Sequence, residues 1–496
     1  MRCSRSSWMT SPTSLELRRA GGAGQAGRPP LPERAVRAAS AIASAAIFRA
    51  AVVLGGVVAL NGALALCGAA RAATLEVGPG RPFSRIEDAA AAARPGDVIL
   101  IHPLADGRPY ERTAVNVRQA KLTFRGVPAR GQRWVRISGK GFDYSGAGST
   151  PRAIFQFNRG TDDCVVENLE LCDARNNSQN GAGVRINQAN NVVVRHCSIH
   201  DNDMGMMSNG DGSDRFGDGQ LIEHCVIHNN GSKDRPGYNH NLYLGGAGVT
   251  LRFCEVHSST TGHNVKSRAH RTRVEYCFVH DSANREFDLV DAGETGLPGS
   301  DAVLVGNVIV KDPKCEGNRA VIHFGQDVGK PRNGTLVLVM NTIVTPFISP
   351  VVELSSPGAK ARMVGNLIAD GGSQRAGQQW VAVRSGAEIE GVSAEWNWLN
   401  GSFAAPPGAA VDARTNLFRR FAGALFVDPA RGDWRPTADA ARAATVPAEK
   451  IRAALVGIPV VEGAKAQPLP GWQYRHPADK AERPSRQRVT LGALEP

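Results

Sequence analysis

The sequence predicts an all-β solenoid, a fold in which short strands stack turn upon turn along one axis. Three observations lead to this prediction. The 496 residues show no regular alternation of β and α segments. Glycines, 55 in all, and asparagine-rich turns separate short runs of valine, isoleucine and leucine. The same strand pattern also recurs along most of the chain, and units that cannot bury an apolar face alone must stack on their neighbours.

One repeated segment gives the register of the stack. It begins with VENLEL at 166–171 and VRHCSI at 194–199 and ends with AEWNWL at 394–399. Successive copies lie 23 to 34 residues apart, which excludes hexapeptide-type and leucine-rich coils of fixed length but still requires stacked equivalent units. Alignment places one column at Leu169, Cys197, Cys225, Cys254, Cys277, Asn307, Asn341, Asn366 and Asn397.

A second set of strands precedes the first in each turn, beginning with IFQF at 154–157 and ending with VVEL at 351–354. Period-2 alternation directs their apolar residues inward and leaves one residue outward between them. Neighbours in such an outward column lie about 4.8 Å apart. The predicted outward column is Gln156, Arg185, Met207, Tyr243, Lys266, Asp288, His323 and Glu353.

The ends of the solenoid have their own signals. Ser84 and Glu87 form a capping-box pattern before an alanine-rich stretch, and Pro95 follows it, so we expect one short helix that caps the first turn. The solenoid is expected to span residues 74–400. Residues 401–496 are expected to form an irregular closing segment that covers the last turn, with residues 464–496 on the surface or disordered.

Residues 1–73 are predicted to be an extension that contains a signal peptide. The weakly apolar run Ala51–Ala70 follows arginines and ends in small residues, which favours cleavage after Ala72 or Ala73 and a secreted or periplasmic protein without a membrane span. A lipoprotein anchor at Cys67 is the alternative. Oligomeric state is not encoded in any motif.

The charge balance narrows the class of partner. Of the formal net charge of +12, residues 1–73 hold +7, which leaves +5 for the rest of the chain. That balance permits a polyanionic ligand. The sequence has no dense lysine and arginine tract with interleaved aromatics, so it does not favour a nucleic acid.

Cysteines and histidines repeat in register, but both patterns have structural explanations. The four cysteines of the aligned column are expected to stack inward as small hydrophobic residues. The histidines His200, His228, His257 and His280 end successive strands, and a polar ladder is favoured over a metal site for them.

The stretch from Asn239 to Asp291 is the candidate active site. NHNLYLGG, GHNVKSRAHR and REFDLVDAG follow one another there, and the pair His-Asn recurs 23 residues apart. Three successive turns would then carry chemically capable side chains on one outward face, which favours a site over a solvated surface. The residues concerned are His240, Asn241, Tyr243, His263, Asn264, Lys266, Arg268, Glu286, Asp288 and Asp291.

These residue types suit the cleavage of a uronate-containing polysaccharide by β-elimination. A lyase removes the proton next to the sugar carboxylate, so it needs a cation that neutralises this carboxylate and a base close to the carbon. Asn264, Glu286 and Asp288, and at the end of the strand Asp291, are candidate calcium ligands. Substrate contacts are expected from Asn241, Arg185, Arg271 and His323.

The two strand sets resemble the right-handed parallel β-helix of the pectate lyase superfamily over residues 74–400. The Lys-Ser step at 266–267, with amides and carboxylates around it, is similar to the chondroitinase B and alginate lyase group. In that group lysine is the base, arginine is the acid and calcium holds the substrate carboxylate. The resemblance implies Lys266 as base and Arg268 as acid, with Arg185, Arg271 and Arg285 as competing arginines.

A physical tension leaves the choice of base open. A carboxylate beside Lys266 favours its charged form and weakens it as a base. His263 titrates near neutrality without such help and is the rival, and Tyr243 and His240 complete the catalytic candidates.

Two other functions also stay open. A glycoside hydrolase on the same fold would pair Glu286 or Asp288 with Asp291. A non-catalytic exported carbohydrate-binding or envelope protein would need aromatic residues along the groove, and aromatics make up only 6% of the chain.

Overall fold

A computed structural model describes residues 72–146, 150–372, 377–458, 469–484 and 486–496. The predicted signal peptide at Ala51–Ala70 and the lipoprotein alternative at Cys67 lie outside the described residues. Within those ranges, no helix has the length and apolar character that a membrane crossing requires.

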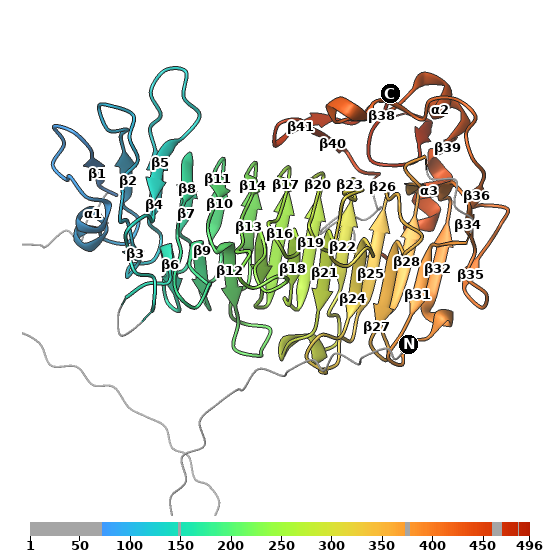
Figure 1. Cartoon of the computed structure of the whole chain (residues 1–496), viewed down its shortest axis with the longest axis horizontal. Coiled ribbons are helices and arrows are strands. Elements are labelled where there is room, and N and C mark those ends of the chain that lie inside the picture. Colours follow the sequence, from blue (N-terminus) through green and yellow to red (C-terminus); the bar gives the residue numbers. More distant parts are fainter. Residues whose placement is uncertain (1–71, 147–149, 373–376, 459–468, 485) are drawn as a thin grey trace, which may run out of the picture. The chain divides into compact units, whose positions relative to one another are not determined.

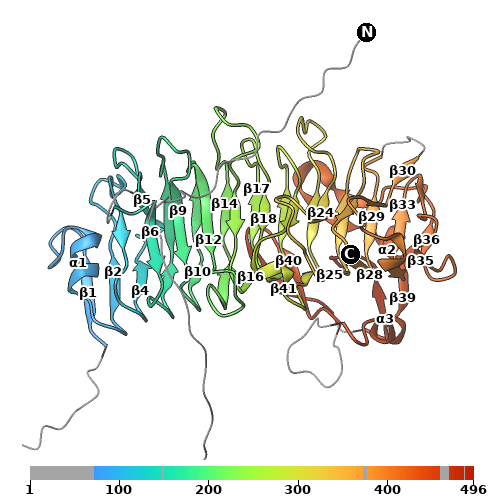
Figure 2. The ribbon, with the colours of Figure 1, turned by 90° about the horizontal axis from the view of Figure 1, so that it is seen from below.

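Three long sheets, parallel throughout, wind along one axis (Figures 1 and 2). We call the 13-stranded sheet A, the 11-stranded sheet B and the 10-stranded sheet C. Sheet A contains β1 (Thr74–Val77), β2 (Val98–Ile101), β4 (Thr123–Gly126), β7 (Val165–Glu167), β10 (Val193–Arg195), β13 (Gln220–Glu223), β16 (Gly248–Arg252), β19 (Arg271–Glu275), β22 (Ala302–Val305), β25 (Thr335–Val339), β28 (Lys360–Val364), β32 (Val392–Glu395) and β35 (Ala410–Val411).

Sheets B and C take the other two strands of each turn. Sheet B contains β5 (Val135–Ser138), β8 (Leu169–Cys172), β11 (Ser198–His200), β14 (Val226–His228), β17 (Glu255–His257), β20 (Phe278–His280), β23 (Val308–Val310), β26 (Thr342–Val344), β29 (Leu367–Ala369), β33 (Trp398–Asn400) and β36 (Leu417–Phe418). Sheet C contains β3 (Val115–Asn116), β6 (Ala153–Asn158), β9 (Ala182–Asn187), β12 (Met204–Asn209), β15 (Leu242–Leu244), β18 (Val265–Ser267), β21 (Phe287–Val290), β24 (Ile322–Gly325), β27 (Val352–Ser355) and β31 (Val381–Val383).

Each aligned segment of the sequence forms parts of two strands, whereas the sequence pattern suggested a single strand. Its third residue adopts a left-handed conformation, for example Asn168 at φ 59°, His196 at 52° and Tyr276 at 51°. This single residue turns the chain from sheet A into sheet B. The repeat VENLEL therefore covers the end of β7 and the start of β8, and each turn has three strands where the sequence pattern revealed two.

The interior confirms the predicted inward column. Cys197, Cys225, Cys254 and Cys277 are fully buried and free, among other apolar side chains. In later turns asparagines replace them. Each asparagine Nδ2 then donates to the Oδ1 of the next, at 2.9 Å from Asn307 to Asn341 and 3.0 Å from Asn341 to Asn366.

The first turn is capped by α1 (Ile86–Ala92), as expected (Figure 1). The capping-box prediction is wrong in detail. The N-cap residue is Arg85, without a side-chain hydrogen bond, and the Glu87 carboxylate instead accepts from the Ala114 backbone N–H at 2.9 Å.

The C-terminal segment differs from the prediction in where it lies. The solenoid continues to β36, beyond residue 400. The chain then packs along the outward side of sheets A and B (Figure 1). The sequence had instead predicted a cover over the last turn. The Gly492 N–H, for example, donates to Gly365 O at 2.8 Å. This segment contains β37 (Phe426–Asp428), β38 (Asp433–Pro436), α2 (Ala438–Ala443), β39 (Thr445–Pro447), α3 (Ala448–Ala454), β40 (Trp472–Arg475), β41 (Asp479–Glu482) and β42 (Arg488–Thr490).

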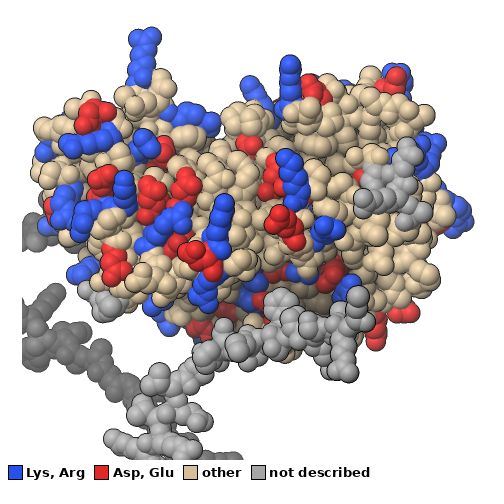
Figure 3. Space-filling model, in the orientation of Figure 1, with Lys and Arg blue, Asp and Glu red and all other residues tan. Residues whose placement is uncertain are grey.

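The remaining elements are short. They are η1 (Glu294–Gly296), η2 (Ile389–Gly391), η3 (Pro429–Arg431), β30 (Gln378–Gln379) and β34 (Phe403–Ala404). On the face drawn in Figure 3, basic and acidic side chains are interspersed.

Candidate active site

The outward face of sheet C carries the predicted row. Strand pairing aligns Tyr243 with Lys266, Lys266 with Asp288, Asp288 with His323 and His323 with Glu353. In the other direction, the row continues from Tyr243 through Met207 and Arg185 to Gln156. The register of the predicted outward column is therefore confirmed along its whole length.

Asp288 is the centre of this row and is 2% exposed. Its Oδ2 lies 2.9 Å from Lys266 Nζ and 3.3 Å from His263 Nε2. Its Oδ1 lies 2.8 Å from His323 Nδ1 and 3.3 Å from Arg285 NH1. Burial acts to raise the pKa of Asp288, but His263, Lys266 and His323 hold it well below its usual value. Asp288 is thus a fixed negative charge.

Lys266 bridges two carboxylates. Its Nζ lies 2.9 Å from Asp288 Oδ2 and 2.9 Å from Asp327 Oδ2, and the side chain is almost completely buried. Burial lowers the pKa of Lys266, yet the charges of Asp288 and Asp327 outweigh burial and raise it. The resting lysine is therefore an ammonium ion. As the sequence implied, the neighbouring carboxylates make it a weaker base.

Asp327 is the site residue that the sequence did not reveal. It lies in the loop after β24, outside the repeated strand positions, so no column could include it. It accepts from Arg268 NH2, while Arg268 Nε donates to Tyr243 Oη at 2.8 Å and NH1 donates to Asp291 O. The three guanidinium nitrogens are therefore all engaged, and Arg268 joins the phenol of Tyr243 to the Asp327 carboxylate.

Asp291 organises that loop. Its buried carboxylate accepts the backbone N–H groups of Asp327 at 2.6 Å, Val328 at 3.0 Å and Lys330 at 2.5 Å. A carboxylate with these lone pairs filled has a structural role. The calcium and hydrolase roles considered for Asp291 do not fit this arrangement.

His240 and His263 stack behind the row, with ring centroids 5.0 Å apart. His240 Nδ1 accepts the His263 backbone N–H at 3.0 Å, and His263 Nδ1 accepts the Arg285 backbone N–H at 3.2 Å. Burial lowers the pKa of His263 to about 3 and that of His240 well below its usual value. The proton of neutral His263 then lies on Nε2, facing Asp288, so the ring has no free lone pair for a base.

Asn241, Asn264 and Glu286 do not lie on the outward face of sheet C, contrary to the sequence prediction. They form a fully buried ladder at the turn between sheets B and C, in which Asn241 Nδ2 donates to Asn264 Oδ1 at 2.8 Å and Asn264 Nδ2 donates to Glu286 Oε2 at 2.6 Å. The residue before each sheet C strand satisfies backbone groups of the turn and does not face solvent. Burial raises the pKa of Glu286 to about 7.

The predicted calcium ligands therefore do not fit a calcium ion. Two of the three, Asn264 and Glu286, are committed to the buried ladder, and the oxygens of the third, Asp288, are bonded to cationic and imidazole groups. A calcium site needs several oxygens that converge on one point.

The three competing arginines occupy different places. Arg285 belongs to the site, because NH1 lies 3.3 Å from Asp288 and NH2 lies 3.4 Å from Glu353. Arg271 begins β19 in sheet A and pairs with Asp218 at 3.1 Å, so it lies outside the row of sheet C.

Arg185 lines a polar cavity of about 370 Å³ on the outward face of sheet C. Its Nε donates to Asn187 Oδ1 at 3.1 Å and NH1 lies 3.3 Å from Met207 Sδ, and neither acceptor carries a charge. Burial and the charge of Arg152, which lines the same cavity, lower the pKa of Arg185. The lining residues are Asn116, Gly146, Thr150, Arg152, Gln156, Asn158, Arg185 and Asn187, without a carboxylate among them.

No protein-family model and no curated protein sequence matches this chain. Among solved structures, the pectate lyase Pel9A is similar at 15% identity over 85% of this chain and 96% of its own, with a TM-score of 0.40. A lacto-N-biosidase from Eubacterium ramulus is similar at 12% identity over 66% and 67%, with a TM-score of 0.36. The alginate lyase AlyGC is similar at 13% identity over 74% and 55%, with a TM-score of 0.35.

The chain is a parallel β-helix protein. At TM-scores of 0.40 or less, none of these similarities bears on its activity. The chemistry of this β-helix rests on its own residues, because lysine and arginine side chains, the carboxylates of Asp288, Asp327 and Glu353, and the phenol of Tyr243 lie together along the row of sheet C. Such a site can bind an anion and exchange protons with it.

Proposed function

We propose that this protein is a lyase that cleaves an acidic, uronate-containing polysaccharide by β-elimination in the groove of sheet C. The main support is the position of Lys266, whose ammonium group is fixed on the outward row beside Arg268 and Tyr243. The lysine is the proposed base. The predicted signal peptide at Ala51–Ala70 would export the enzyme to such a polymer.

Each group then has a role in the elimination. The reaction removes the proton from the carbon next to the sugar carboxylate and protonates the departing glycosidic oxygen. Arg268 and Arg285 bring positive charge to the site, which lowers the energy of the carbanion-like transition state. Because the Tyr243 oxygen accepts from Arg268 Nε, its own hydrogen is left free to be donated to the leaving oxygen.

This assignment changes the role of Arg268 from the one implied by the resemblance. Its nitrogens are all bonded to Tyr243, Asp291 or Asp327, so it orients the phenol and the loop. Tyr243 is the better proton donor.

Hydrolysis by paired carboxylates is the second candidate. Asp288 and Asp327 lie 2.9 Å from the same Nζ, so their oxygens are within about 6 Å of each other, close to the separation in retaining glycosidases. Hydrolysis needs one carboxyl that stays protonated as the acid. The pKa of each is lowered, that of Asp288 strongly, so both are ionised and elimination is favoured.

Product chemistry tests the proposal. Elimination leaves a 4,5-unsaturated uronate that absorbs in the ultraviolet, whereas hydrolysis gives reducing ends without this absorbance, and binding gives neither. Alginate, pectate and chondroitin should be assayed with wild type and Tyr243→Phe. We expect wild type to produce this absorbance and Tyr243→Phe to produce it at least tenfold more slowly. Reducing ends without absorbance would establish a hydrolase instead.

A further inference from the structure

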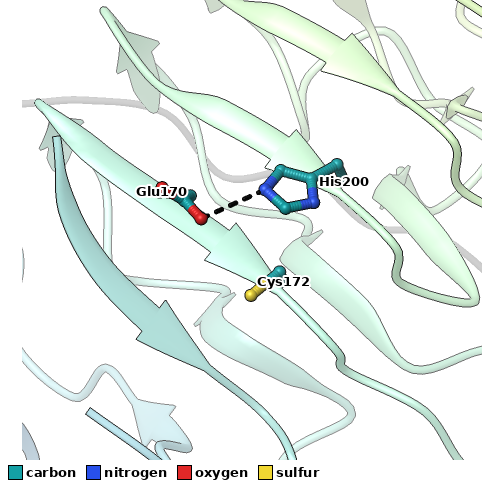
Figure 4. Close-up of side chains that lie close together, drawn as sticks. All are labelled: Glu170, Cys172 and His200. Atoms are coloured by element: carbon teal, nitrogen blue, oxygen red, sulfur yellow. Dashed lines mark hydrogen bonds and ion pairs between the residues drawn. The ribbon is translucent and has the colours of Figure 1, made fainter. Parts of the chain in front are cut away.

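A second cluster of reactive side chains lies on sheet B, on a different sheet from the proposed active site. Glu170 and Cys172 are two residues apart on β8, so they face the same side, and strand pairing aligns Cys172 with His200 of β11 (Figure 4). One ligand atom of each, a carboxylate oxygen, Sγ and an imidazole nitrogen, lies within 4.8 Å of the others.

His200 is oriented as a ligand. Its Nδ1 lies 2.7 Å from Asp201 Oδ2, while Nε2 lies 3.3 Å from Glu170 Oε1 and faces the cluster. A carboxylate that holds one ring nitrogen fixes the tautomer and directs the other nitrogen, as in carboxylate–histidine–zinc arrangements.

A fourth candidate ligand, the Asp173 carboxylate, lies close to the thiol. Cys172 is 4% exposed, and its Sγ lies 3.2 Å from Asp173 Oδ2, which also accepts from Ser138 Oγ at 2.9 Å. Arg136 donates from Nε to Glu170 Oε1 at 2.9 Å, which fixes the carboxylate and offsets part of its charge. Arg136 bonds only this one oxygen of Glu170, and the second carboxylate oxygen accepts no hydrogen bond from it.

Cys172 also differs from the four cysteines of the aligned column, to which it does not belong. Cys197, Cys225, Cys254 and Cys277 belong to the inward column, whereas Cys172 shares the outward face with the histidine ladder. The next ladder residue, His228, stacks on His200 with ring centroids 4.9 Å apart, and strand pairing aligns it with His200 of the preceding turn and not with a cysteine. The ladder therefore acquires a sulfur ligand only at His200.

We propose that Glu170, Cys172 and His200 bind one divalent metal ion of the zinc class, with Asp173 or water as the fourth ligand. Thiolate, imidazole and carboxylate are the ligands that Zn²⁺ takes in tetrahedral sites. Sulfur disfavours the oxygen-preferring Ca²⁺ and Mg²⁺. The ion replaces the hydrogen on Sγ and the one that Nε2 shares with Glu170, and both protons pass to solvent.

The site clamps two neighbouring strands and does not depend on the proposed lyase activity. Titration of the full chain with ZnCl₂ in a non-thiol reductant should give one bound ion at this site, with CaCl₂ and MgCl₂ as controls. Cys172→Ser and His200→Asn should each weaken binding at least tenfold, while His228→Asn, the matched histidine of the next turn, should leave it unchanged.

Cobalt supplies a direct signature of the sulfur ligand. Wild type with Co²⁺ should show a near-ultraviolet thiolate-to-metal band that Cys172→Ser removes. If the serine variant fails to fold, loss of this band in His200→Asn serves the same purpose. Three results would overturn the proposal. Wild type could bind no zinc, Cys172→Ser could bind zinc as well as wild type, or His228→Asn could weaken zinc binding as much as Cys172→Ser does.

Discussion

At the scale of single residues, the site is a set of buried charges that balance one another. Asp288 and Lys266 are each almost fully buried, and each would be unfavourable alone. Their mutual contacts, with His323 and Asp327, hold both in the charged form. Catalysis by Lys266 therefore requires loss of a proton that two carboxylates stabilise.

The pH dependence of the rate follows from this balance. The pKa of Lys266 is raised above that of a free lysine, so the fraction of neutral amine grows about tenfold per pH unit through the neutral and mildly alkaline range. The initial elimination rate should rise with pH without a plateau up to about pH 9. A plateau near pH 7 would identify a different base.

Glu286 predicts a pH dependence of stability. Its folded-state pKa, about 7, lies above the ordinary value of 4.5, so the folded protein binds more protons in the window between these values. The free energy of unfolding should therefore fall as pH rises from about 4.5 to 7, by up to about 3 kcal/mol from this residue. Denaturant unfolding of wild type and Glu286→Gln from pH 5 to 8 measures it. Equal slopes in the two proteins would contradict the assignment.

At the scale of elements, the row of sheet C is the feature that the sequence predicts best. Strict alternation in GVRI, NLYL, NVKS and FDLV defines which residue faces outward, and the pairing from Arg185 to Glu353 follows from it. Three strand spacings, about 14 Å, separate Arg185 from Lys266 along the row. A polysaccharide in the groove can therefore reach both.

Arg185 should act on binding and not on chemistry. Arg185→Ala should raise KM for a uronate polymer about tenfold and leave kcat nearly unchanged, because it removes a charged contact remote from the proton transfer. Arg271→Ala, outside the row, is the matched control. A fall in kcat at constant KM would place Arg185 in the reacting centre.

The features that the sequence did not reveal have a common cause. Alternation describes strands, but Asp327 lies in a loop and Asn264 lies at a turn, where side-chain direction follows backbone hydrogen bonding. His196 and Tyr276 look like strand residues, yet their left-handed backbone divides one apparent strand into two. Asparagine, aspartate and histidine are enriched in that conformation, but tyrosine, phenylalanine and methionine are not, and Tyr276, Phe253 and Met340 adopt it in this chain, so residue type does not mark the position.

At the scale of the whole molecule, the C-terminal segment completes the outward side of sheets A and B. Its packing includes Arg483, which is almost completely buried and pairs with Glu495, with Nε 3.0 Å from Oε1. NH1 and NH2 of Arg483 also donate to the carbonyls of Gly492 and Thr490. The buried Arg483–Glu495 ion pair therefore helps to hold the end of the chain, together with hydrogen bonds such as that from Gly492 to Gly365.

Removal of that ion pair should loosen the segment. Arg483→Ala leaves the Glu495 carboxylate buried without its partner and should lower the free energy of unfolding by about 3 kcal/mol. Hydrogen exchange should also speed up in residues 469–496. Arg431→Ala, which breaks only an exposed pair with Asp428, should change stability by less than about 1 kcal/mol. Equal effects of the two substitutions would contradict the role given to Arg483.

The central claim is that Lys266 performs a β-elimination, and the most direct measurement is the ultraviolet absorbance of the product from alginate, pectate and chondroitin. Wild type should generate unsaturated uronate from at least one of them. Lys266→Ala should reduce the rate at least a thousandfold, whereas Lys360→Ala, an exposed lysine at the start of β28, should keep the full rate. Unchanged absorbance with Lys266→Ala would contradict the account.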